Sequence, residues 1–240
     1  MKPDISADSD ELSRKVAEWL VNYIQHVLDT KDRFTIALSG GSTPQKLYHL
    51  LSGPPYAEKI NWKAIHFFWG DERYVPYQDD RNNAKMAFTT LLEKVPVEKN
   101  NIHRMRTDIE PDDAAAEYET ILRSYFKRDE KSFDLVLLGL GDDAHTLSLF
   151  PGYDVMFEKE KWVRAFFLEK QQMFRITLTV PVINMASQII FLVTGGDKAM
   201  PVSQVIYGMH QPDLYPAQMI QPYNGQVQWY LDKAAAKEIS

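Results

Sequence analysis

The chain contains no cysteine, and this absence excludes a disulfide framework, thiolate chemistry and any metal site built on cysteine. It also lacks a run of about 18 apolar residues, the length that a membrane-spanning helix requires. The opening residues 1–12 are acidic and contain no apolar core of signal-peptide length. We therefore expect a soluble, cytoplasmic protein with no membrane partner.

Positive charge is scarce as well. The chain has 27 Lys and Arg residues but 33 Asp and Glu residues, so its formal net charge is −6. Binding to a nucleic-acid backbone needs a basic face, and the composition therefore argues against a nucleic-acid partner. If the ligand is an anion, its positive charges must be gathered locally.

The length and the apolar content allow a substantial core. With 240 residues, of which 45% are hydrophobic, the chain is compatible with one large α/β domain or with two small ones. We find no internal repeat, low-complexity tract or domain boundary. We therefore expect a single domain over residues 1–240.

Strand and helix patterns alternate along the chain. Short apolar runs bounded by turn residues predict buried strands, and apolar residues at three- and four-residue spacing predict helices. The predicted strands cover residues 34–38, 65–69, 133–138, 162–166, 188–193 and 227–231, and the predicted helices cover 8–29, 45–51, 84–92, 112–127 and 232–239. This alternation indicates a three-layer, Rossmann-like α/β fold, with a parallel-rich sheet and helices on both faces.

A glycine turn follows the first of these strands. The strand at 34–38 runs directly into SGGSTP at 39–44 and then into a helix. We expect Thr43 to cap this helix and Pro44 to occupy its first position. The free N–H groups of a helix start, beside two glycines and two hydroxyls, suit a phosphate group. An ordinary tight turn would explain the same residues, so this motif alone is a weak indication.

Charged residues follow the strand at 65–69, where the sequence reads Asp71-Glu72-Arg73. Packing such a group against an apolar strand is costly unless the charges pair with one another or face a polar crevice. A solvated, salt-bridged turn is the other interpretation.

Two further cations lie beside predicted elements. Lys198 belongs to a third glycine turn, TGGDKA at 194–199, near a helix start where a cation is disfavoured unless an anion lies nearby. Arg175 heads an otherwise apolar run at 175–181. Taken singly, each is better explained as a solvated charge than as a ligand contact.

The stretch FDLVLLGLGDDAHTLSLFPG at 133–152 delivers acids and a histidine at the end of a buried strand. Ligands of parallel sheets lie at the carboxyl ends of the strands, and here Gly139 and Gly141 allow a sharp turn. We expect Asp143 and His145 to point into the crevice that this turn borders, since a histidine can exchange a proton near neutral pH. A surface turn rich in glycine and aspartate is the alternative.

Taken together, these motifs resemble the 6-phosphogluconolactonase family. The resemblance is carried by SGGSTP at 39–44, GDERYVP at 70–76, GLGDDAHTLSLFPG at 139–152, RITLTVPVI at 175–183 and TGGDKA at 194–199, with a similar C-terminal segment at 216–236. It implies hydrolysis of 6-phospho-D-glucono-1,5-lactone to 6-phospho-D-gluconate in the oxidative pentose phosphate pathway. It implies no organic cofactor and no required metal, and a small sugar-phosphate lactone as the ligand of a monomer or weak homo-oligomer.

The resemblance also implies roles for particular residues. His145 would take a proton from the water that attacks C1 and return one to the leaving ring oxygen, with Asp71 or Asp143 orienting the imidazole. A δ-lactone is an activated ester, and no GxSxG motif is present, which favours attack by water over an acyl-enzyme. The implied phosphate-binding residues are Ser39, Gly40, Gly41, Ser42, Thr43, Arg73, Arg175 and Lys198.

One position departs from the family pattern. The family usually reads Gly-x-Asp-Gly-His, whereas Ala144 stands directly before His145 in this chain. If the family's glycine serves a positive φ or a close approach of the ligand, the Cβ of Ala144 has a cost.

Two other functions remain as alternatives. The glucosamine-6-phosphate deaminase class shares the fold and a similar phosphate loop, but its motif DGHIAFNEP has a catalytic glutamate where Phe150 precedes Pro151 here, and a tyrosine where Arg73 stands. Both differences favour the lactonase. A non-catalytic sugar-phosphate sensor of a transcription regulator is disfavoured by His145 and by a chain that opens directly with the covering helix.

Overall fold

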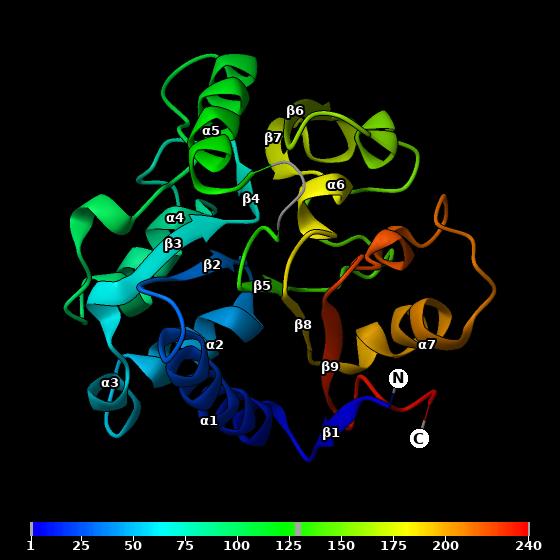
Figure 1. The fold of residues 1–240 in the computed structure, drawn as a ribbon. Helices are drawn as coiled ribbons and strands as arrows, with labels where there is room; N and C mark the ends of the chain where they lie inside the picture. The colour runs from blue at the N-terminus through cyan, green and yellow to red at the C-terminus, as the bar shows by residue number, and fades with distance from the viewer. Residues whose placement is uncertain (1, 128–130, 240) are drawn as a thin grey trace.

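A sheet of six parallel strands forms the centre of the fold (Figure 1). The computed structural model of the chain describes residues 2–127 and 131–239. The strands are β1 (Asp4–Ser6), β2 (Phe34–Leu38), β3 (Ile65–Trp69), β5 (Leu135–Leu138), β8 (Gln188–Val193) and β9 (Gln226–Asp232). Their order is β1-β9-β8-β5-β2-β3, and every neighbouring pair is parallel. Their carboxyl ends therefore meet at one edge of the sheet, where ligands of such folds bind.

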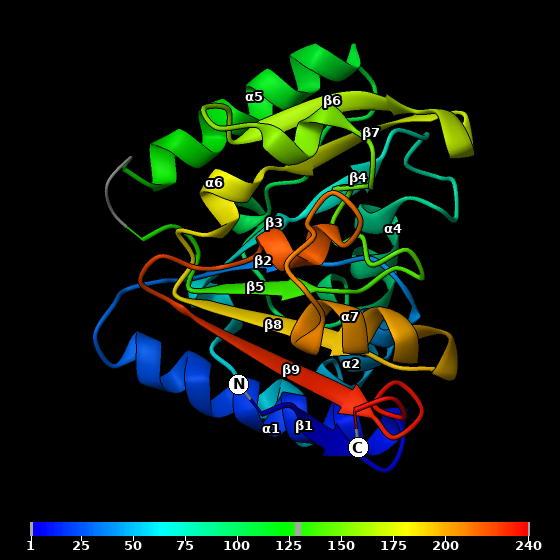
Figure 2. The ribbon, with the colours of Figure 1, turned by 90° about the vertical axis from the view of Figure 1, so that its right-hand side faces the viewer.

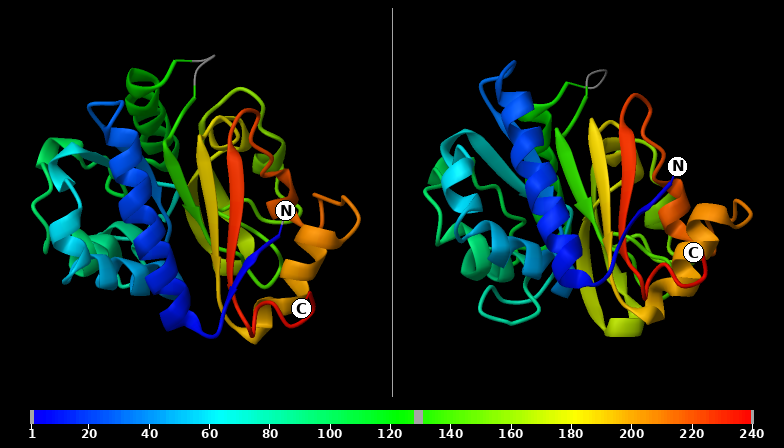
Figure 3. Two further views of the ribbon diagram at one scale, coloured as in Figure 1. Left: turned by 60° about the horizontal axis from the view of Figure 1, so that its bottom comes forward. Right: turned by 90° about the horizontal axis from the view of Figure 1, so that it is seen from below.

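Helices cover both faces of this sheet. They are α1 (Ser9–Leu28), α2 (Ser42–Leu51), α3 (Tyr56–Lys59), α4 (Asn83–Ala87), α5 (Pro111–Tyr125), α6 (Val180–Ile183) and α7 (Ala199–Tyr207). Figure 3 shows α1 packed on one face of the sheet, which α2 also covers, while α5, α6 and α7 pack on the other face. The predicted fold class is confirmed. No helix among the described residues is both long and apolar enough to cross a membrane.

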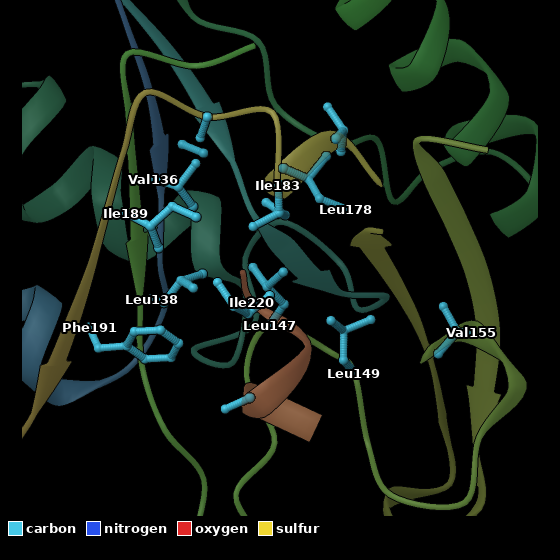
Figure 4. Packing of buried hydrophobic residues seen from close by; sticks show 14 of the residues in the cluster. Val136, Leu138, Leu147, Leu149, Val155, Leu178, Ile183, Ile189, Phe191 and Ile220 are labelled. Carbon is cyan, nitrogen blue, oxygen red and sulfur yellow. The ribbon is translucent and has the colours of Figure 1, made fainter. Parts of the chain in front are cut away.

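The side chains of each central strand alternate between two hydrophobic clusters. In β5, Leu135 and Leu137 pack on the side of α1 and α2, whereas Val136 and Leu138 point to the opposite side (Figure 4). All four side chains are fully buried, because a parallel strand covered on both faces has no polar side. The two clusters share one sheet, which favours the single domain expected over residues 1–240; that organisation stays a prediction.

A second, antiparallel sheet of three strands was not predicted as such. It consists of β4 (Asp71–Arg73), β7 (Met173–Leu178) and β6 (Val163–Leu168), in the order β4-β7-β6. Figure 2 shows β6 and β7 beside α5, above the six-stranded sheet. The pairing matters for the site because it sets Arg73 directly opposite Arg175.

The predicted helix at 232–239 is wrong. Residues 233–239 form turns, and the carboxylate of Asp232 accepts the N–H of Ala235 at 2.7 Å and that of Gly195 at 3.1 Å. These bonds turn the chain back toward the glycine turn that follows β8. The hydrophobic periodicity of residues 232–239 could not reveal the hydrogen bond between Asp232 and Gly195, because Gly195 lies far away in the sequence.

Candidate active site

The carboxyl ends of β2, β5 and β8 border a pocket of about 340 Å³, with β4 and β7 on another side. Apart from Asp143, every residue predicted for the site lines it: Ser39, Gly40, Gly41, Ser42, Thr43, Asp71, Arg73, His145, Arg175 and Lys198. A wider cleft of about 860 Å³ lies beside α7, but no Lys, Arg, Asp or Glu is among its described lining residues. The smaller pocket is therefore the one whose charges suit an anionic ligand.

Asp143 lies behind the pocket wall, against His145. Its Oδ1 is 2.5 Å from Nδ1 of the imidazole and also accepts the backbone N–H of His145 at 3.2 Å. Burial alone would raise the pKa of Asp143, but the hydrogen bonds and the charge of His145 lower it to about 2. Asp143 is thus ionised and holds Nδ1, which leaves Nε2 of His145 as the nitrogen that can accept a proton from a ligand or water.

The turn that carries His145 is tight. The N–H of Gly141 donates to the carbonyl oxygen of His145 at 2.8 Å, and a Cβ on Gly141 would lie 2.0 Å from the imidazole Nδ1. Ala144 has a φ of 61° and Leu147 a φ of 56°, both in the left-handed region that disfavours residues with a side chain. The Cβ at Ala144 therefore carries the conformational cost that the comparison with the family pattern anticipated.

Asp71 bonds to groups other than the imidazole of His145. Its Oδ2 accepts a hydrogen bond of 2.6 Å from the hydroxyl of Ser148 and lies 3.6 Å from Nη1 of Arg175. The side-chain amide of Asn83 donates to its backbone carbonyl at 3.0 Å. Asp71 is therefore the counter-charge of a buried arginine, and Asp143 is the partner of His145.

Arg73 and Arg175 form a cross-strand pair of like charges. They are register partners in β4 and β7, and the Nε of each is buried without a hydrogen-bond partner among the described residues. Burial lowers the pKa of Arg175; the charge of Asp71 raises it and that of Arg73 lowers it. Like charges opposite one another destabilise a sheet, and a buried donor without a partner is costly. An anion in the pocket would relieve both costs.

The glycine turn after β2 offers backbone donors to the same pocket. The helix α2 begins at Ser42 with Gly41 as its N-cap, and no side chain caps it, so the expected cap by Thr43 and first position for Pro44 are wrong. The hydroxyl of Thr43 instead lies 2.7 Å from that of Thr194, which ties this turn to the one after β8. The N–H groups at the start of α2 remain available to an anion.

Lys198 lines the pocket from the turn after β8. Its ammonium group lies 2.9 Å from the carboxylate of Asp197, an exposed side chain. The carboxylate of Asp232 holds this turn by accepting the N–H of Gly195 with both oxygens, each at 3.1 Å. The turn is thus fixed by the end of β9, and the charge of Lys198 is only partly offset.

Glu72 lies next to the site but supports its frame. It is fully buried, and its carboxylate accepts backbone N–H groups from Asn83 at 2.7 Å, Arg73 at 2.8 Å and Ala84 at 2.8 Å. Burial raises the pKa of Glu72 to about 7, although these bonds act in the opposite direction. Glu72 thereby fastens the start of α4 to β4.

Several pocket residues were not predicted. Thr194 and Thr146 line the pocket within motifs that were recognised, and Ser148 holds Asp71 from the same segment as His145. Gln171 accepts a hydrogen bond from Nη2 of Arg175. Nothing in the sequence pointed to Gln171, because it lies in the connection between β6 and β7, whose pairing was not predicted.

Within residues 2–127 and 131–239, no group of three or more His, Cys, Asp or Glu side chains comes together in a way that could hold a metal ion. The expectation of a site without metal or organic cofactor stays a prediction.

Similar proteins match the chain over nearly its whole length. The model of the family described as glucosamine-6-phosphate isomerases/6-phosphogluconolactonase matches residues 7–229. A 6-phosphogluconolactonase of a Nostoc species is 39% identical over 241 residues, covering 99% of this chain and 98% of that relative.

Solved structures agree with the sequence matches. The crystal structure of the devB protein is 33% identical, with a TM-score of 0.92 and coverage of 100% of this chain and 99% of the other. The 6-phosphogluconolactonase from Trypanosoma brucei is 29% identical, with a TM-score of 0.86 and the same coverage. These matches include every segment that forms the pocket. The chain therefore belongs to the glucosamine-6-phosphate isomerase/6-phosphogluconolactonase family.

Proposed function

We propose that the protein hydrolyses 6-phospho-D-glucono-1,5-lactone to 6-phospho-D-gluconate in the oxidative pentose phosphate pathway, with His145 as general base. The observation that carries the proposal is that the Asp143–His145 pair and the opposed arginines Arg73 and Arg175 border one pocket. A sugar-phosphate lactone needs this combination of a proton acceptor and a separate anion site. The names of the relatives support the same reaction.

In the proposed mechanism the phosphate group binds to Arg73, Arg175, Lys198 and the start of α2. Nε2 of His145 takes a proton from water as its oxygen forms a bond with C1 of the lactone. The ionised carboxylate of Asp143 accepts the Nδ1–H and stabilises the imidazolium. When the bond between C1 and the ring oxygen breaks, Nε2 returns the proton to that oxygen, so the imidazole is neutral again at the end of the cycle.

The alternatives find less support. Phe150, with an apolar ring, stands where the deaminase class has its catalytic glutamate, and it is buried. A non-catalytic sensor has no need of an ionised aspartate held against a histidine in the binding pocket. The proposed partner is a small sugar-phosphate lactone, and the monomeric or weakly oligomeric state stays a prediction.

The deciding experiment is a coupled assay on freshly generated 6-phosphogluconolactone, corrected for spontaneous hydrolysis, of the wild type and His145→Gln. We expect turnover to fall by about 10²–10⁴, the usual contribution of a positioned acid–base group. Affinity for 6-phosphogluconate should persist, because other residues bind the phosphate. His210→Gln, at a histidine outside the pocket, is the matched control and should keep the wild-type rate. A folded His145→Gln variant with near wild-type turnover would remove His145 from the mechanism.

A further inference from the structure

The ring of Phe150 lies against the two groups that the proposed mechanism depends on. Its centroid is 4.0 Å from that of the His145 imidazole, with 28° between the planes, and 5.8 Å from Cζ of Arg175. Phe150 is 4% exposed and is not among the residues that line the pocket. It therefore touches the proton acceptor and a cation of the anion site from behind, without facing the ligand.

The ring is itself held in place. The backbone around it is fixed by the N–H of Leu149, which donates to Thr146 at 3.0 Å, and by the N–H of Tyr153, which donates to Phe150 at 3.3 Å. The ring of Tyr153 packs against it edge-on, at 6.5 Å and 68°. Phe150 also belongs to the large hydrophobic cluster between the two sheets. A ring fixed in this way can serve as a rigid surface for its neighbours.

His145 needs such a surface. The hydrogen bond from Nδ1 to Asp143 fixes one atom of the imidazole, but it leaves the ring free to swing about that atom. A stacked aromatic face restricts the plane of the ring and therefore the direction in which Nε2 points. The same face lies within the range at which a guanidinium is attracted to an aromatic ring.

We infer that Phe150 is a positioning residue, which fixes the imidazole plane of His145 and the guanidinium of Arg175 relative to each other. This inference rests on the proposed function, because it assigns Phe150 a role in that reaction. Its consequence is that the proton acceptor and the anion site are aligned through one buried side chain.

The test is Phe150→Leu, which keeps an apolar side chain but removes the flat face. We expect kcat for the lactone to fall about 10- to 100-fold, since a misplacement of about 1 Å can have this effect, and KM to rise. Phe150→Tyr keeps the ring and should restore both values toward wild type. Phe126→Leu is the matched control: Phe126 is buried in the same cluster, but its ring contacts Phe68 and Phe133 rather than His145 or Arg175, so its loss should leave kcat and KM unchanged.

A double-mutant cycle separates positioning from a general loosening of the fold. In the His145→Gln background, Phe150→Leu should lower kcat no further, because the group that Phe150 orients is already gone. An equal fold-loss of kcat in both backgrounds, or wild-type kcat and KM in folded Phe150→Leu, would overturn the inference. If Phe150→Leu does not fold, Phe150→Met replaces it in the same cycle.

A second readout does not depend on activity. Stacking at 4.0 Å should shift the ring-proton resonances of His145 in NMR spectra, and Phe150→Leu should move them while Phe126→Leu does not. A wild-type protein that does not accelerate lactone hydrolysis would refute the proposed function. The positioning of His145 by Phe150 would then stand or fall on these resonances alone.

Discussion

Arg175 is the residue on which the proposed anion site depends most, because it is buried, lies opposite Arg73 and has the carboxylate of Asp71 3.6 Å away as a counter-charge. We expect Arg175→Ala to weaken binding of 6-phosphogluconate at least tenfold, since a charged hydrogen bond of this kind is worth about 1.5–3 kcal/mol. Calorimetric titration of the product measures this. Arg164→Ala, on β6 and outside the pocket, is the control. Equal turnover of phosphorylated and plain gluconolactone would refute the phosphate site.

Replacing Ala144 by glycine tests the conformational cost of the left-handed φ at this position, in the turn that carries His145. In the folded state, glycine removes the cost of about 1–2 kcal/mol that the left-handed φ imposes on alanine. Glycine also gives the unfolded chain more conformational entropy, which lowers the free energy of unfolding by about 0.4–1 kcal/mol. We therefore expect Ala144→Gly to keep activity and to change the free energy of unfolding by less than about 1 kcal/mol. Ala186→Gly, equally buried and without a positive φ, should only destabilise. Denaturant titrations compare the two, and a collapse of activity in Ala144→Gly would show that the methyl group shapes the turn.

A histidine pair links β3 to α5 on the side of the sheet away from α1. The hydroxyl of Tyr125 lies 2.9 Å from Nδ1 of His66 and 2.7 Å from Nε2 of His103. Burial lowers the pKa of His103 to about 4, with a further decrease from the charge of His66. Burial also lowers the pKa of His66, and Arg33, which stacks on Tyr125, adds to that decrease.

This pair gives the fold a pH dependence. Below pH 6.5 the unfolded chain binds protons that folded His103 does not, so the free energy of unfolding should fall as the pH drops from 6.5 to about 4. The loss should be on the order of 1 kcal/mol, since partial exposure screens the effect. Urea titrations should show a shallower acid-side decline for His103→Gln than for the wild type, with exposed His210→Gln as control. Parallel declines would assign the acid sensitivity to other groups.

The elements that were predicted with their observed bounds are β2, β3 and β8. Each is largely buried on both faces and contains a single polar residue, so it reads as a nearly continuous apolar run. The strand β4 could not be found in this way, because Asp71, Glu72 and Arg73 have no strand pattern and pair with β7, far along the chain. Gln171 was missed for the same reason. The sequence alone did not decide between Asp71 and Asp143 as the partner of His145, because that choice depends on the conformation of the turn that carries His145.

The whole chain is acidic, yet its pocket gathers cations. Parallel strands with neighbouring carboxyl ends bring together turns that lie far apart in sequence, from Ser39 to Lys198. That convergence was predictable from strand order in general terms, since glycine turns after buried strands mark the ligand edge of such a sheet. The position of Arg73 opposite Arg175 was not predictable, because it depends on the pairing of β4 with β7 in the second sheet.

The opposed arginines have a practical consequence for the protein in solution. Two neighbouring guanidinium groups, each with a buried Nε atom that has no partner among the described residues, should attract small oxyanions as well as the proposed substrate. Inorganic phosphate or sulfate in a buffer would then occupy the pocket, stabilise the folded chain by mass action and compete with the lactone. The buffer becomes a ligand, so thermal stability and apparent KM measured in phosphate describe a partly inhibited protein.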